Sequence, residues 1–312
     1  MIITVVIPCY NVSKHIEEVI LRLPNEISNI IVVNDCSTDD TDCVLKRITV
    51  ECKKIIYIKH DKNQGVGGAM ITGFSKSLEL DSDITIKLDG DDQMDCSYIP
   101  KLIQPIREGK ADFTKGNRFR DFRALRKMPV LRRVGNLGLS FLIKAASGYW
   151  NIFDPANGFI AISKETLQSI DFNKIHKRYF FESSMLIEMY YSNTVIVDIP
   201  MKAKYGNEVS NLSVTRTLFE FPPKLIIAFI RRIILKYYVF DFNIASLYTF
   251  FGTVFFFSGT IYGIVSFFKY QHLKMGAPTG TVVIPTLLIT LGVQLLLSAI
   301  SFDIGNFPKK NS

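Results

Sequence analysis

Short apolar runs alternate with amphipathic stretches over roughly the first two-thirds of the chain. Runs rich in β-branched and aliphatic side chains predict buried strands at residues 2–7, 29–33, 55–58, 83–86, 111–114, 159–162 and 195–199. Between them lie stretches with a helical period, and the first places Ile16, Val19, Ile20 and Leu23 on one face. This alternation predicts an α/β domain built on a mostly parallel, doubly wound sheet.

The pattern changes at residues 221–223, after which the chain becomes strongly apolar. Residues 224–240 carry Arg231, Arg232 and Lys236 on one side, which is typical of an amphipathic helix on an anionic membrane face. The two segments that follow contain no charged side chain and are long enough to span a bilayer. We therefore expect an α/β domain at residues 1–220, an interfacial helix at 221–243, transmembrane helices at 244–268 and 275–302, and a tail at 303–312.

The charges around this pair of spans predict its orientation. Two spans joined by a short turn form a hairpin whose ends lie on one side of the membrane. Basic residues flank those ends, namely Arg231, Arg232, Lys236, Lys309 and Lys310, whereas the turn carries Lys269 and Lys274. By the positive-inside rule we expect a multi-pass protein of the cytoplasmic (inner) membrane with both ends in the cytoplasm. Met1 leads directly into the first strand, so no signal peptide is expected.

Composition narrows the partners further. The formal net charge of +8 suits anionic partners such as nucleotide phosphates or a membrane surface. No motif for reading bases occurs, so nucleic acid is not expected as a partner. The five cysteines lack CxxC spacing and the four histidines are scattered, which argues against a zinc site or a disulfide framework.

An acidic cluster follows the fourth predicted strand. Asp89, Asp91 and Gln93 alternate along the chain, and Gly90 would let the backbone turn so that all three point to one side. Carboxylate and amide oxygens suit a hard divalent cation, Mg²⁺ or Mn²⁺, that also holds phosphates. The end of a strand is also where ligands bind in open α/β sheets. The alternative is a solvated acidic turn, and a calcium-binding EF-hand loop is not expected because its last glutamate is missing.

Two further stretches allow more than one interpretation. The glycines of residues 65–69 fit a dinucleotide-binding fingerprint incompletely, and close packing of a helix N-terminus against the sheet explains them better. A basic stretch runs from Arg118 to Arg133 and leads into residues 134–150, which are nearly uncharged. Those residues could form a core helix or a helix lying in the membrane interface.

Four segments together resemble the family 2 glycosyltransferases of the GT-A (Rossmann-like) fold. They are residues 6–11 (VIPCYN), 33–39 (VNDCSTD), 89–93 (DGDDQ) and 116–119 (GNRF). Within that family the chain is similar to polyprenyl-phosphate hexosyltransferases, of the dolichyl-phosphate mannose synthase and bactoprenol glucosyltransferase type. The resemblance covers most of the first 215 residues, and the expected hairpin matches bacterial members.

The resemblance implies roles for individual residues. Pro8, Tyr10 and Asn11 would line the nucleotide, Asp35 would contact its base or ribose, and Asp89 with Gly90 would lie beside it. Asp91 and Gln93 would hold the divalent metal, so that Asp91 also belongs to the nucleotide site. Arg118 would meet the acceptor phosphate, with Arg132 and Lys204 as further candidates, and Asp89, Asp91, Arg118 and Glu182 are the candidate catalytic residues.

The chain also departs from the dolichyl-type pattern. Val12 replaces a glutamate, Lys204 replaces an arginine, and Ser210–Asn211 replaces Ser-Lys in the late polar loop. Glu182 stands near the position of the catalytic base of relatives that act on sugar hydroxyls, but no aspartate follows it.

The implied reaction moves a hexose from a UDP- or GDP-sugar to an acceptor with inversion at the anomeric carbon. A polyprenyl (undecaprenyl or dolichyl) monophosphate has a second pKa of about 6, so it is already a nucleophile at neutral pH and needs cations rather than a base. The alternatives are transfer to a sugar hydroxyl of a lipid-linked oligosaccharide with Glu182 as base, and a non-enzymatic membrane scaffold. The sequence leaves open whether the protein is a homo-oligomer.

Overall fold

The computed structural model describes residues 1–118, 130–155, 157–202 and 214–310. The chain divides into two compact units, which are Met1–Phe229 with Pro308–Ser312, and Ile230–Phe307.

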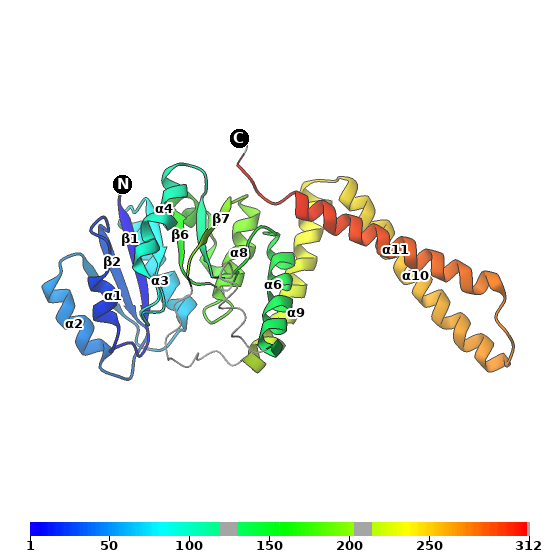
Figure 1. The fold of residues 1–312 in the computed structure, drawn as a ribbon, viewed down its shortest axis with the longest axis horizontal. Helices are drawn as coiled ribbons and strands as arrows, with labels where there is room; N and C mark the ends of the chain where they lie inside the picture. The colour runs from blue at the N-terminus through cyan, green and yellow to red at the C-terminus, as the bar shows by residue number, and fades with distance from the viewer. Residues whose placement is uncertain (119–129, 156, 203–213, 311–312) are drawn as a thin grey trace. The chain divides into compact units, whose positions relative to one another are not determined.

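A seven-stranded sheet organises the described part of the first unit (Figure 1). Its strands are β1 (Ile3–Cys9), β2 (Asn29–Asn34), β3 (Ile55–Lys59), β4 (Ile84–Lys87), β5 (Phe113–Asn117), β6 (Ile160–Ser163) and β7 (Ile196–Pro200). Their order is β3-β2-β1-β4-β6-β5-β7, and only β6 runs antiparallel to its neighbours. The predicted mostly parallel sheet is confirmed, and the strand bounds differ from the predicted ones by a few residues.

Helices cover both faces of this sheet. They are α1 (Ile16–Leu21), α2 (Thr41–Glu51), α3 (Val66–Glu79), α4 (Ile99–Arg107), α6 (Val130–Ser147), α7 (Lys164–Ser169), α8 (Phe181–Tyr191) and α9 (Val214–Ile234), with short 3₁₀ turns η1 (Cys96–Tyr98) and η2 (Phe172–Lys174). Successive strand residues point to opposite faces, so Val5 and Ile7 join a core with α1, α2 and α4. Val6 joins the other core, with α3, α6 and α8.

Residues 134–150, predicted to form either a core helix or an interfacial helix, lie mostly in α6. Ile143 and Ala146, in its C-terminal half, and Tyr149 after it are buried in the core, so this end is a core helix. Leu137 and Phe141, which precede these buried residues, are exposed. Binding of this exposed part of the helix to a membrane interface stays a prediction.

The second unit contains a helical hairpin. Its elements are the last turn of α9, a π-helical segment η3 (Leu235–Phe240), α10 (Ile244–Leu273) and α11 (Thr279–Gly305). The helices α10 and α11 lie side by side (Figure 1) and are long and apolar enough to cross a membrane, by length and composition. A Cβ on Gly292 would lie 2.6 Å from the backbone nitrogen of Phe256, so only glycine permits this close approach of the two helices. The predicted pair of apolar helices is confirmed, and its orientation stays a prediction.

Two details of this region differ from the predicted pattern. The helix α9 begins at Val214 and includes Pro222 and Pro223, so the change in composition falls inside a helix. Arg232, expected among the membrane-facing cations, is buried instead. It donates from both Nη atoms to the carboxylate of Asp303, at 2.9 and 2.7 Å, and Asp303 belongs to α11 rather than to a tail.

Candidate active site

The predicted site residues gather at one edge of the sheet. The strands β1, β2, β4 and β5 run in the same direction, so the loops that follow them leave the sheet together. Pro8 lies near the end of β1 with Tyr10 and Asn11 just after it, Asp35 follows β2, the acidic loop 89–93 follows β4, and Arg118 follows β5. The topology therefore brings together motifs that are distant in sequence, as expected for ligand-binding loops of an open sheet.

Among the described residues of these loops, three that are not glycine have a left-handed backbone. They are Asn11, Cys36 and Asp92, with φ of 54°, 58° and 60°. Such residues are uncommon outside glycine and are worth noting near ligand sites. The sharp turn after β4 thus occurs at Asp92. Gly90, for which a turn was predicted, has no positive φ, and a Cβ there would lie 3.4 Å from Ile7.

The loops after β1 and β2 are tied to each other through Asn11. Its backbone N–H donates to Ser37 Oγ at 3.1 Å, and its side-chain oxygen accepts from the Thr38 N–H at 2.8 Å. The helix α2 begins only at Thr41, after this loop. Asn11 therefore fixes the loop that carries Asp35, and Tyr10 beside it is exposed.

Asp35 is buried and anchors the start of α3. Its carboxylate accepts from the N–H groups of Gln64 and Gly65 at 2.8 and 2.7 Å, and it pairs with His60 Nδ1 at 2.7 Å. Gly65 and Gly67, at the start of α3, were expected to pack against the sheet. They lie instead against the loop of residues 176–178. A Cβ at Gly65 would lie 2.6 Å from the carbonyl oxygen of Lys177.

The acidic loop is held both within itself and by a residue distant in sequence. Asp91 accepts from the backbone N–H of Gln93 at 3.1 Å, while Asp92 pairs with Arg22 at 2.8 Å. Across the residues described, no group of three His, Cys, Asp or Glu side chains forms a metal site. A divalent ion at Asp91 and Gln93 would therefore need most of its ligands from a bound phosphate and water. That is the way proteins usually hold Mg²⁺.

Beneath this loop, Lys87 holds two carboxylates. Its Nζ donates to Asp89 Oδ1 at 2.6 Å and lies 3.5 Å from Glu182 Oε1, in the first turn of α8. Burial alone would lower the pKa of Lys87, but the charges of Asp89 and Glu182 outweigh burial and raise that pKa above its ordinary value. Asp89 and Glu182, predicted from separate motifs, thus meet at one buried ammonium.

On the next strands, Lys115 and Arg118 follow the same edge. Lys115 is buried and donates to the carbonyl of Asn157, and burial lowers its pKa to about 8. Arg118 forms a two-bond pair with Asp154, from Nε at 2.7 Å and from Nη2 at 3.1 Å. Gly116 makes room here, since a Cβ on it would lie 2.6 Å from Asn157 Nδ2. The guanidinium of Arg118 is therefore held in one orientation.

Two predicted phosphate ligands cannot be placed. Lys204 lies outside the described residues, and Arg132 belongs to α6 but its side chain lies outside the described part.

Comparisons with known proteins now identify the family. The family model described as "Glycosyl transferase family 2" matches residues 4–171, which is more than half of the chain. This protein is a family 2 glycosyltransferase. A "UDP-N-acetylglucosamine--dolichyl-phosphate N-acetylglucosaminyltransferase" of Methanococcus voltae is 36% identical over 217 residues, which cover 65% of this chain and 86% of that protein.

Other relatives point to the same family. An "Undecaprenyl-phosphate mannosyltransferase" of Micrococcus luteus is 26% identical over 64% of this chain and 83% of its own length. Among solved structures, glucosyl-3-phosphoglycerate synthase from Mycobacterium tuberculosis in complex with UDP has a TM-score of 0.54 at 20% identity, covering 74% of this chain and 79% of that one. That likeness supports the GT-A fold of the glycosyltransferase domain.

The glycosyltransferase domain also contains site residues that sequence reasoning missed. Lys87, His60 and Asp154 each hold a predicted residue in place. A lysine at the end of an otherwise apolar strand was a signal for Lys87, because such a side chain is rarely buried without a partner.

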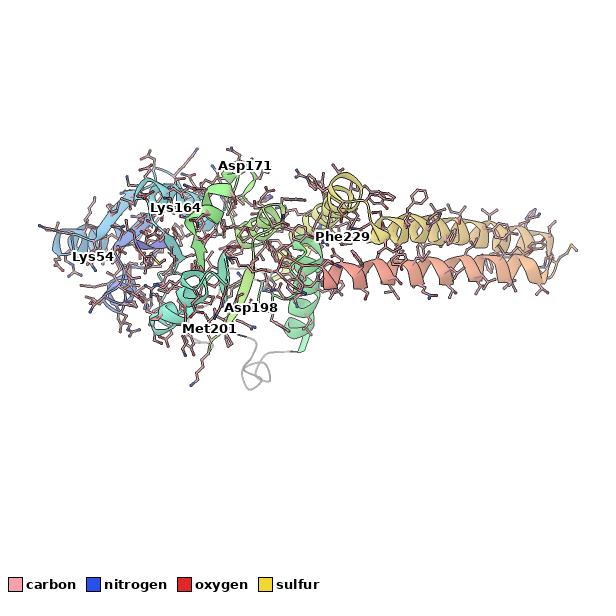
Figure 2. The ribbon with its side chains drawn as sticks, turned by 90° about the horizontal axis from the view of Figure 1, so that it is seen from above. Lys54, Lys164, Asp171, Asp198, Met201 and Phe229 are labelled. Carbon is pink, nitrogen blue, oxygen red and sulfur yellow. The ribbon has the colours of Figure 1, made fainter. Side chains whose placement is uncertain are left out.

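A further carboxylate, the half-buried Asp198 of β7, is labelled in Figure 2. Its Oδ2 accepts from Phe153 N at 2.7 Å and from Asn117 Nδ2 at 3.1 Å, whereas its Oδ1 has no hydrogen-bond partner among the described residues. Burial raises the pKa of Asp198 to about 6.

Proposed function

We propose that this glycosyltransferase moves a hexose from a UDP- or GDP-sugar to the phosphate of a polyprenyl monophosphate, with inversion, at the cytoplasmic face of the membrane. One observation carries the proposal. Arg118, oriented by the buried Asp154, stands at the same sheet edge as the acidic loop, while the candidate base Glu182 is already paired with Lys87. The acceptor side thus offers an oriented cation, which suits a phosphate better than a hydroxyl.

The relatives support a lipid phosphate as acceptor. Those from Methanococcus voltae and Micrococcus luteus are named for dolichyl phosphate and undecaprenyl phosphate, and each is matched over more than four-fifths of its length. The two apolar helices α10 and α11 would keep the enzyme at the membrane that contains such a lipid. The flanking basic residues favour a hairpin with both ends in the cytoplasm.

A divalent cation, Mg²⁺ or Mn²⁺, fits the donor side. Asp91 and Gln93 would hold it together with the diphosphate oxygens, and it would neutralise the charge that builds on the leaving diphosphate. The exposed ring of Tyr10, together with Pro8, would line the base, and Asp35 would fix the surrounding loops.

On the acceptor side the chain supplies position rather than proton transfer. Arg118 would bind the lipid phosphate and direct one of its oxygens at the anomeric carbon, opposite the leaving diphosphate. The phosphate is ionised at neutral pH, so this attack needs no base.

Product analysis tests the proposal. Full-length protein, undecaprenyl or dolichyl monophosphate, Mn²⁺ or Mg²⁺ and a panel of UDP- and GDP-sugars are incubated, and the lipid products are identified by mass spectrometry. We expect a polyprenyl monophosphate hexose from at least one donor, with an anomer opposite to that of the donor by NMR. A hexose attached only to a lipid-linked oligosaccharide, or a retained anomer, would contradict the proposal.

A further inference from the structure

The ammonium of Lys87 connects the donor loop to helix α8. The side chain is 1% exposed, and its two carboxylate partners come from different elements, Asp89 after β4 and Glu182 in α8. Moving a lysine out of water is unfavourable unless it is paired, and loss of one partner from a buried pair leaves an uncompensated charge. The position of this lysine therefore depends on both carboxylates, and theirs on it.

The two carboxylates are only partly enclosed. Their side chains are 32% and 17% exposed, and each uses one oxygen toward Lys87. The second oxygens, Asp89 Oδ2 and Glu182 Oε2, have no hydrogen-bond partner in the described part of the chain. Two acceptor oxygens are thus available, one from the acidic loop and one from helix α8.

Gly158 leaves just enough room for this arrangement. A Cβ on Gly158 would press on Lys87 Nζ and would lie 3.1 Å from Asp89 Oδ2. The absence of a side chain at Gly158 thereby helps to maintain the position of the ammonium, independently of charge.

We propose that Lys87 is a positioning residue that holds Asp89 and Glu182 as a pair of carboxylates accepting hydrogen bonds from hydroxyl groups of the donor. The inference rests on the proposed function, because it concerns the nucleotide sugar. Those hydroxyls belong either to the ribose or to the transferred sugar, and both present the same chemistry. Without Lys87 the two carboxylates repel each other across the space it leaves, so one of them moves away from the donor.

Binding of two ligands to purified full-length protein with Mn²⁺ tests this role. The ligands are the nucleotide sugar used in product analysis and the matching nucleoside diphosphate. Hydrogen bonds to charged groups contribute about 1.5–3 kcal/mol, so Lys87→Met should weaken nucleotide-sugar binding roughly ten- to a hundredfold. Weakening of both ligands assigns the hydroxyls to the ribose, and weakening of the nucleotide sugar alone assigns them to the transferred sugar.

The double variant Lys87→Met/Glu182→Gln separates positioning from simple packing. Removing the second negative charge relieves the repulsion, so this variant should bind better than Lys87→Met alone. A lysine that only fills space predicts no such recovery. Lys164→Met is the matched control, because it breaks an ion pair with Asp81 of the same 2.6 Å length at the opposite end of the sheet. It should bind like the unchanged protein.

Gly158→Ala covers the case in which Lys87→Met does not fold. The added methyl group meets the flexible end of Lys87, so it displaces the ammonium while the backbone can stay in place. Weakened donor binding is expected here too. Unchanged binding in Gly158→Ala, or no recovery in the double variant, overturns the inference, whereas a wild-type protein that binds no nucleotide sugar overturns the proposed function instead.

Discussion

The ion pairs at the strand ends and the ion pair in the hairpin unit use the same side-chain types but differ in how completely they are enclosed. The side chain of Lys87 is 1% exposed and that of its partner Asp89 is 32% exposed. Likewise, Asp154 is 0% exposed and its partner Arg118 is 42% exposed. In Arg232–Asp303 both are buried, at 1% and 4%, and Tyr237 donates a further bond to the same carboxylate at 2.5 Å.

This difference separates two uses of buried charge. A half-exposed pair fixes one side chain while its outer atoms can still reach a ligand, whereas a closed pair contributes only to the structure around it. We therefore expect that breaking the closed pair mainly changes stability, and that breaking the half-exposed pairs mainly changes catalysis or binding.

The largest effect should come from breaking the closed pair. Arg232→Met leaves Asp303 buried without its main cation, which should cost about 3–5 kcal/mol. Unfolding of the full-length protein in detergent, followed by circular dichroism, measures this, and nucleotide binding should not change. Arg231→Met is the control, because Arg231 is exposed on the same helix. Equal stability of the two variants would argue against the distinction.

The next effect concerns two neighbouring carboxylates. Asp91→Ala removes the proposed metal ligand, and loss of electrostatic stabilisation of this kind costs about a hundred- to a thousandfold in rate. Asp92→Asn is the matched variant, because Asp92 is bound to Arg22 at 2.8 Å and is not a proposed ligand. Transfer assays should show a much smaller loss for it. Full activity in excess EDTA would refute the metal site.

The half-buried carboxylate of Asp198, which forms no ion pair with a described residue, extends the comparison to pH. The pKa of Asp198 is raised to about 6, so the folded state binds its proton more tightly than the unfolded state does. The resulting penalty is fully present above about pH 6 and is lost as pH falls toward the ordinary value of 3.8.

We therefore expect Asp198→Asn, which cannot ionise, to be stabilised relative to the wild type by about 2.5 kcal/mol more at pH 8 than at pH 4. Denaturant unfolding at both pH values measures the change. Asp171→Asn, at an exposed carboxylate, provides the comparison. If the difference in stability between Asp198→Asn and the wild type does not vary with pH, ionisation of Asp198 does not destabilise the folded protein.

The smallest effect is expected at the half-exposed pair Arg118–Asp154. Arg118→Ala should slow transfer to lipid phosphate about ten- to a hundredfold, since a charge-assisted contact contributes roughly 1.5–3 kcal/mol. Arg118→Lys should recover only part of this, because the planar fork is lost. Hydrolysis of the donor by water should change less. If Glu182→Gln abolishes transfer while Arg118→Ala is nearly normal, the acceptor is a sugar hydroxyl.

Much of the fold was predictable because strand patterns and loop motifs are local. The strand ends place Asp35, the acidic loop and Arg118 on one edge, which follows from a parallel sheet without knowledge of the packing. What was missed depends on partners distant in sequence. Lys87 with Glu182, Arg118 with Asp154 and Arg232 with Asp303 are separated by 95, 36 and 71 positions. No periodicity reports such pairs, and Arg232 was misassigned for this reason.

The lengths of the hairpin helices have a consequence for any membrane that they cross. The helix α10 has 30 residues and α11 has 27, so at about 1.5 Å per residue each is roughly 40–45 Å long. The hydrocarbon layer of a typical bilayer is only about 30 Å thick. The hairpin must therefore incline or extend into the headgroup region, and bilayer thickness becomes a variable that acts on the angle of the whole pair.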